Sequence, residues 1–103
     1  MPNSVLRTVP DENGFYFYQS LGSPLGLRAN SLEEFSKELE TVDPSSIRFH
    51  LGRQDFENWI SMLGDPTLAK QISTLRSKKL SDAELKTQLV RVVRLRLGKL
   101  RKA

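Results

Sequence analysis

The sequence of 103 residues contains no cysteine, one histidine and no long apolar run. The absence of cysteine excludes disulfides, thiolate nucleophiles and cysteine-ligated zinc, and the single His50 excludes a histidine-rich metal site within one chain. The apolar runs are far shorter than the ~20 residues that a membrane span needs. Residues 1–14 lack the basic stretch and long apolar run of a signal peptide. We therefore expect a cytoplasmic protein without a metal or other cofactor.

The hydrophobic fraction of 38% and the charged fraction of 27% are typical of a soluble globular domain. A chain of this length has room for one core. We predict that residues 1–13 form an N-terminal extension and that residues 14–103 form a single globular domain. This domain is expected to end in a basic amphipathic helix at about residues 82–101.

Charge is distributed unevenly along the chain. Residues 1–50 carry four basic and seven acidic side chains, a net charge of −3, whereas residues 51–103 carry twelve basic and five acidic side chains, a net charge of +7. Most of the positive excess follows Pro66. This asymmetry indicates an end of the molecule that faces a polyanion, although a solvated basic surface would give the same pattern.

The segment GFYFYQ, residues 14–19, alternates between phenylalanine and tyrosine, which is typical of a β-strand. The segment SLGSPLG that follows is rich in turn-forming residues, and LGLRA is able to return as a second strand of a hairpin. We expect Phe15 and Phe17 in the core, with Tyr16 and Tyr18 at its rim.

Cap signals predict where several helices begin. Ser31 with Glu34 forms a capping box for a helix that ends near Val42, and Ser81 with Glu84 forms another for the C-terminal helix. Asp-Pro pairs at residues 43–44 and 65–66 place a cap before a proline at the first helical position. The first pair favours a short helix, but alternating apolar residues leave a strand at residues 47–51 as an alternative.

Asp55 is expected to cap the helix FENWISML, whose apolar residues recur with helical spacing and which Gly64 is placed to end. The predicted fold is mainly α (α+β): a small bundle of four to five short helices with an N-terminal aromatic β-hairpin or strand. Arg96 falls within the apolar arc of the last helix, so it must extend to solvent, meet an acidic residue or belong to an interface. The predicted core contains Phe35, Leu39, Phe56, Trp59, Ile60, Leu63, Leu68, Ile72, Leu89 and Val92.

The sequence contains no pattern that indicates catalysis. A continuous helix would turn His50 and Asp55 away from each other, so that only a break at Gly52 would let them meet, and Ser61 lies in no motif that activates a nucleophile. We interpret Asp55 as a helix cap and His50 as a residue at a helix end or with one structural hydrogen bond. No phosphate-binding loop is present either. We predict no catalytic residues and a protein that is not an enzyme.

The C-terminal segment KTQLVRVVRLRLGKLRKA carries the functional prediction. Its basic side chains, together with a nearby lysine pair, are expected to follow the phosphate backbone of RNA or DNA, alone or in a ribonucleoprotein. The predicted nucleic-acid-binding residues are Arg91, Arg94, Lys99, Arg101, Lys102, Lys78 and Lys79.

The alternative is a protein-interaction or regulatory adaptor. In that case the exposed helix face, or the surface around Tyr16 and Tyr18, would dock an acidic protein partner or a second copy of the chain. A membrane surface is a weaker option, because the helix lacks the aromatic anchors usual at membrane interfaces.

The segments SLEEF, FHLGRQDFENWI and LGDPTLAKQI, in this order and spacing, resemble an archaeal family of small domains of unknown function. The resemblance runs from about Phe15 to Leu100. It implies a cytoplasmic archaeal domain that occurs alone or attached to larger proteins, and it brings no activity, cofactor or catalytic residue. Family members have Arg-Gly where this chain has Arg53 and Gln54, so the resemblance does not establish a glycine turn there.

Overall fold

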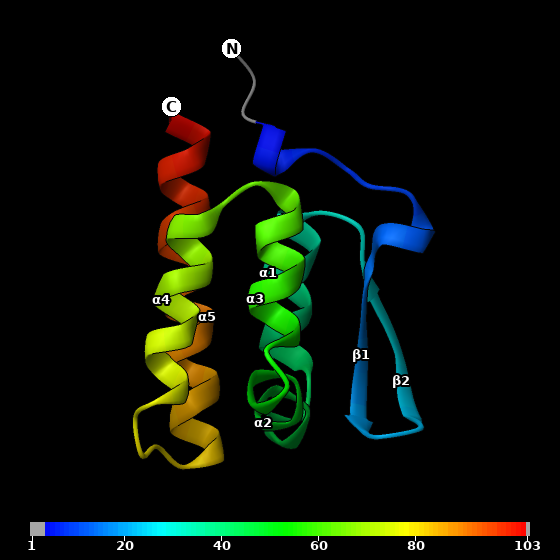
Figure 1. Cartoon of the computed structure of the whole chain (residues 1–103), viewed down its shortest axis with the longest axis vertical. Coiled ribbons are helices and arrows are strands. Elements are labelled where there is room, and N and C mark those ends of the chain that lie inside the picture. The colour runs from blue at the N-terminus through cyan, green and yellow to red at the C-terminus, as the bar shows by residue number, and fades with distance from the viewer. Residues whose placement is uncertain (1–3, 103) are drawn as a thin grey trace.

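The computed structural model describes residues 4–102. Two 3-10 turns (Ser4–Leu6 and Asp11–Asn13) precede β1 (Phe15–Ser20), β2 (Ser23–Ala29), α1 (Leu32–Thr41), α2 (Pro44–Gly52), α3 (Asp55–Leu63), α4 (Pro66–Arg76) and α5 (Asp82–Lys102). Figure 1 shows three layers: the hairpin, then α1, α2 and α3, and then α4 and α5. The predicted mainly helical α+β domain with an N-terminal hairpin is confirmed.

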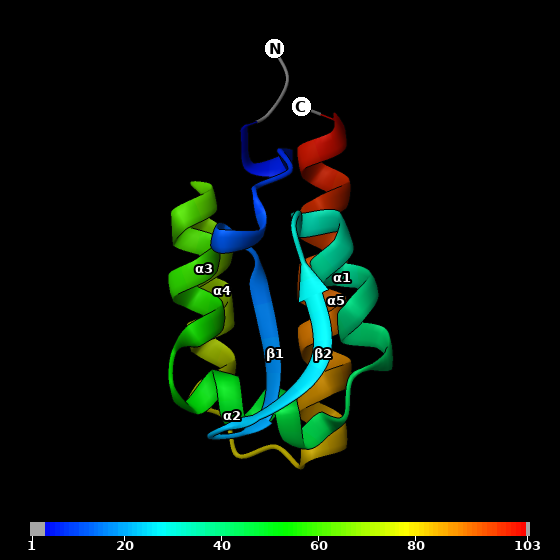
Figure 2. The same ribbon diagram turned by 90° about the vertical axis from the view of Figure 1, so that its right-hand side faces the viewer.

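The hairpin presents one face to the core and the other to solvent. Phe15 and Phe17 are buried, whereas Tyr16 is 44% exposed, as the strand alternation predicts. Figure 2 shows β1 on the side of α3 and β2 on the side of α1. The hairpin therefore covers the aromatic part of the helical layer.

The two strands pair without irregularity only at their open end. Opposite Tyr16 lies Arg28, but opposite Tyr18 lies Pro24, so three residues of β2 face the single Phe17 of β1. Gly26, within this bulge, has a φ of 77°, a conformation that glycine adopts without steric cost. The irregularity at this point belongs to β2, and β1 keeps its alternation from residue 15 to residue 18.

Side-chain caps begin four of the five helices at the predicted positions. Because the first N–H groups of a helix have no partner within it, a side-chain oxygen at the cap stabilises the start. The cap oxygens of Ser31, Asp43, Asp65 and Ser81 accept hydrogen bonds from the backbone N–H groups of Glu34, Ser45, Leu68 and Glu84, respectively. The favoured prediction of a short helix after Asp43 and Pro44 is confirmed, and the alternative of a strand at residues 47–51 is wrong, because these residues belong to α2.

The predicted cap of α3 is wrong. Asp55 is the first residue of α3, and the residue before it, Gln54, makes no side-chain cap hydrogen bond. Gln54 has a φ of 65° and a ψ of 21°, the left-handed conformation that glycine favours. The chain therefore makes a tight turn between α2 and α3 without a glycine.

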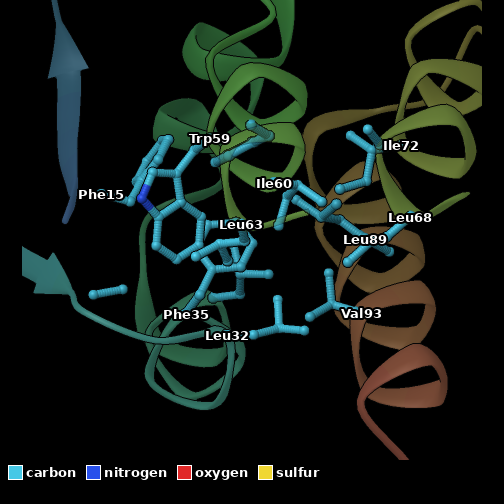
Figure 3. Packing of buried hydrophobic residues seen from close by; sticks show 14 of the residues in the cluster. Phe15, Leu32, Phe35, Trp59, Ile60, Leu63, Leu68, Ile72, Leu89 and Val93 are labelled. Carbon is cyan, nitrogen blue, oxygen red and sulfur yellow. The ribbon is translucent and has the colours of Figure 1, made fainter. Parts of the chain in front are cut away.

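One core joins all three layers, and Figure 3 shows its central side chains. Phe15 stacks on Phe56 with ring centroids 5.2 Å apart, and Trp59 lies beside both Phe15 and Phe35. Nine of the ten predicted core residues are buried, and the exception, Val92, is only partly buried. In its place, Val93 and Leu97 complete the buried stripe of α5.

Arg96 meets an acidic residue, which was one of the three predicted possibilities. Its Nε and Nη2 atoms donate to the two carboxylate oxygens of Asp65 at 2.7 and 3.0 Å. Asp65 is 1% exposed and also caps α4. This bidentate pair therefore joins α5 to the start of α4. In the part of the chain that the structure describes, no helix is long and apolar enough to cross a membrane.

Candidate functional site

His50 is buried in α2 and both of its ring nitrogens are occupied. The backbone N–H of Tyr18 donates to Nε2 at 2.8 Å, so Nε2 carries the lone pair and the proton is on Nδ1. Nδ1 lies 2.9 Å from Oδ2 of Asp55 and donates to it. Burial lowers the pKa of His50 below its ordinary value, against the opposing effect of the hydrogen bond with Asp55. His50 is therefore a neutral side chain that fixes two other segments.

His50 and Asp55 meet because the helix breaks between them. α2 ends at Gly52, and the turn at Arg53 and Gln54 brings Asp55 back toward the ring. His50 lies in the last turn of α2, as one of the two expectations for it had it, and its ring makes two structural hydrogen bonds rather than one. Nε of Arg53 also donates to Oδ2 of Asp55, at 3.1 Å.

α2 binds the backbone of Tyr18 at two points. Besides the bond to His50, the hydroxyl of Ser46 donates to the carbonyl oxygen of Tyr18 at 2.6 Å. Ser46 and His50 are four residues apart and so lie on the same face of the helix. This spacing was the only sequence signal for the contact, and it does not name the partner. The side chains of Ser46 and His50 thus make the hydrogen bonds to the Tyr18 backbone that a neighbouring strand would otherwise make.

A groove of about 760 Å³ lies between β1 and α3; Tyr16 and Tyr18, which were named as a possible docking surface, line it, but the groove itself was not predicted. Asp55, Asn58, Trp59 and Met62 form its α3 wall, with the spacing of one helix face. The 3-10 turn before β1, the hairpin and the end of α2 form the rest of the groove with Glu12, Asn13, Gly14, Phe15, Tyr16, Tyr18, Leu21, Gly22, Phe49, His50 and Arg53. It joins segments that are distant in sequence, which is why no local pattern revealed it.

The predicted nucleic-acid-binding residues are all exposed, but they do not form one patch. Arg94 and Arg101 border a groove between α1 and α5, whereas Lys78 and Lys99 border a groove between α4 and α5. Helical geometry places Arg91 and Lys102 between these two flanks. Lys79 lies in the loop that precedes α5. The five basic side chains on α5 therefore surround the outer side of its C-terminal half, from Arg91 to Lys102.

Only one of these seven side chains forms an ion pair within residues 4–102. Arg101 pairs with Glu33 of α1, and both side chains remain about half exposed. The other six have no carboxylate within ion-pair distance in that range. α1 thus contributes acidic charge to one flank of α5.

Among residues 4–102, no three histidine or acidic side chains are grouped so that they could hold a metal ion.

A family profile described as a family of unknown function (DUF5752) matches residues 3–94 of the chain. No curated protein and no solved structure matches it.

Proposed function

The chain belongs to DUF5752, a family of unknown function, and we propose that it is a non-enzymatic cytoplasmic module that binds the backbone of RNA or DNA through α5. One observation carries the proposal: Arg91, Arg94, Lys99 and Lys102 are exposed and pair with no carboxylate in the described chain. Such cations release counterions from a nucleic acid when they contact its phosphates, which drives binding without reading sequence.

The placement of these cations fits an extended anion rather than a single phosphate. Arg94 and Arg101 are seven residues apart and nearly in line, about 10 Å along the helix, and Arg91 and Lys102 form a second row of about 16 Å. Together these cations cover about 16 Å of α5, its C-terminal half. A backbone that lies along this helix would meet a cation at several successive positions.

The ion pair of Arg101 predicts an unequal contribution. Glu33 neutralises part of the charge of Arg101, whereas Arg94 has no such partner. We expect Arg94→Gln to weaken binding more than Arg101→Gln, because Arg101 must break its ion pair with Glu33 before it can contact a phosphate.

The test is fluorescence anisotropy with a labelled 20-nucleotide single-stranded RNA and a 20-base-pair DNA at 50 and 200 mM salt. We expect affinity to fall steeply with salt, and the variant Arg91→Gln/Arg94→Gln to reduce the slope of log K against log salt by about two. The control is Arg28→Gln/Lys70→Gln, which removes the same formal charge at exposed positions of the hairpin and of α4; Lys70 is unpaired in the described chain like Arg91 and Arg94, whereas Arg28 pairs with Asp11. Absence of binding at 50 mM salt, or equal losses in the two double variants, would contradict the proposal.

A second candidate, a protein-interaction module, is supported by the groove between β1 and α3. Tyr16, Leu21 and Met62 are large, exposed apolar side chains, and all three line this groove. Exposed apolar groups gathered at one concavity are typical of an interaction site. The simplest form of this candidate is self-association through the groove, which light scattering tests. The chain would then be a dimer, and the variant Leu21→Ser/Met62→Ser would be a monomer.

A further inference from the structure

The groove between β1 and α3 has two unlike walls, a strand edge and a helix face. Its floor contains the buried rings of Phe15, His50 and Trp59, and its rims carry Tyr16 and Met62. The β1 wall runs from Gly14 to Tyr18, about 14 Å of extended chain. This length matches four to five residues of an extended peptide.

In this wall, Tyr16 is the residue of β1 whose outward backbone N–H and C=O groups can bind a partner. The N–H and C=O of Tyr18 point away from β2 and are taken by His50 and Ser46. Because β1 alternates regularly between residues 15 and 18, the N–H and C=O of Tyr16 point to the same side, away from β2. The hydroxyl of Tyr16 donates to the carbonyl oxygen of Asp11 at 2.8 Å, which holds the ring at the rim.

Charged side chains lie at both ends of the groove: Arg53, paired with Asp55, at one end and Glu12 at the other. At the α2 end, the guanidinium of Arg53 is held by Asp55 through Nε and lies 5.3 Å from the ring centre of Phe49. Its two terminal nitrogens have no hydrogen-bond partner in the described chain, so they are donors already fixed in position. At the other end, Glu12 is exposed and forms no ion pair within residues 4–102.

We propose that this groove binds an extended peptide segment that pairs with β1 at Tyr16 as a third strand. An antiparallel direction is required for one peptide residue to exchange both hydrogen bonds with Tyr16. The N-terminal end of the segment then lies at Arg53 and carries an acidic side chain, and its C-terminal end lies at Glu12 and carries a basic one. Apolar residues between them cover the aromatic floor.

This inference rests on the protein-interaction candidate and does not depend on the α5 proposal. The probe is the blocked peptide Ac-Asp-Val-Tyr-Val-Lys-NH2, titrated into the full-length, nitrogen-15-labelled protein and followed by NMR. We expect shifts of the Tyr16 amide and of the indole N–H of Trp59, which donates to the carbonyl oxygen of Asn13 at the groove. Absence of these shifts at millimolar peptide would overturn both the inference and the peptide form of the candidate.

Two matched peptides test the binding mode separately from binding itself. The charge-reversed peptide Ac-Lys-Val-Tyr-Val-Asp-NH2 should bind about tenfold more weakly, and the double variant Glu12→Gln/Arg53→Gln should abolish this difference. N-methylation of the central tyrosine removes the donor to Tyr16 and should abolish binding, whereas N-methylation of the second valine, whose N–H points away, should not. If both methylated peptides bind as well as the parent, or the reversed peptide binds equally, the groove is an interaction site but the third-strand inference is wrong.

Discussion

The ion pair between Arg96 and Asp65 tests how α5 is held on the bundle. Asp65 is 1% exposed, and its carboxylate accepts two hydrogen bonds from Arg96 and one from the backbone of Leu68. Arg96→Met keeps the length of the side chain but leaves a buried carboxylate without its counter-charge. Breaking a buried pair in this way costs about 3–5 kcal/mol. Because the Arg96 side chain is 24% exposed, water can reach the site, and we expect about 3 kcal/mol.

Urea unfolding followed by the fluorescence of the single tryptophan, Trp59, measures this loss. Arg94→Met is the matched control: it makes the same chemical change two residues away, at an exposed position without an ion pair, and should change the free energy of unfolding by less than about 0.5 kcal/mol. Adding Asp65→Asn to Arg96→Met removes the stranded charge while keeping a cap for Leu68, and should recover part of the stability. The reasoning is refuted if the two methionine variants are equally stable.

Three further predictions concern the α2–α3 corner and the aromatic core. Gln54→Gly should raise the free energy of unfolding by about 0.5–1 kcal/mol in urea titrations, because it relieves a left-handed residue; a loss would show that the Gln54 side chain stabilises the turn. Burial lowers the pKa of His50 in the folded protein, so the unfolded chain takes up a proton first as the pH falls. Stability should therefore be retained above the ordinary pKa of 6.5 and decrease below it, by at most about 1.4 kcal/mol per pH unit. His50→Gln should flatten this part of the pH profile, and an unchanged profile would assign it to other groups. Trp59→Ala should cost about 3–5 kcal/mol in thermal unfolding by circular dichroism, and a variant as stable as the parent would mean that the indole contributes little to the core.

Local signals explain why most of the fold could be predicted from the sequence. Ser31, Asp43, Asp65 and Ser81 act on N–H groups two or three residues away, so each cap is visible in a short window of sequence. Asp55 has the same local pattern, yet its carboxylate binds His50 and Arg53 instead. These two partners lie only two and five residues before Asp55, and a break at Gly52 was the stated condition for the contact with His50, but the local pattern alone does not say whether the carboxylate caps α3 or turns back to the ring.

The groove could not be predicted for a related reason. Its walls come from the hairpin and from α3, and the residues that join them, such as Trp59 and Asn13, are separated by 46 positions. The alternation of β1 correctly placed Tyr16 outside, but only the packing of α2 against Tyr18 determines which backbone groups stay available. The exposed positions of the basic residues on α5 were easier to predict, because helical periodicity fixes them once the helix is recognised.

The hydrogen bonds of Ser46 and His50 to the Tyr18 backbone also affect how copies of the chain could associate. The outer edge of a hairpin normally exposes a row of unsatisfied amides and carbonyls, a template on which identical chains can stack into aggregates. Two side chains of α2 close that row on the β1 side and leave an opening too short for continuous stacking. A protein that lost both contacts would expose a longer unpaired strand edge, so these two hydrogen bonds also shorten the edge on which another chain could pair.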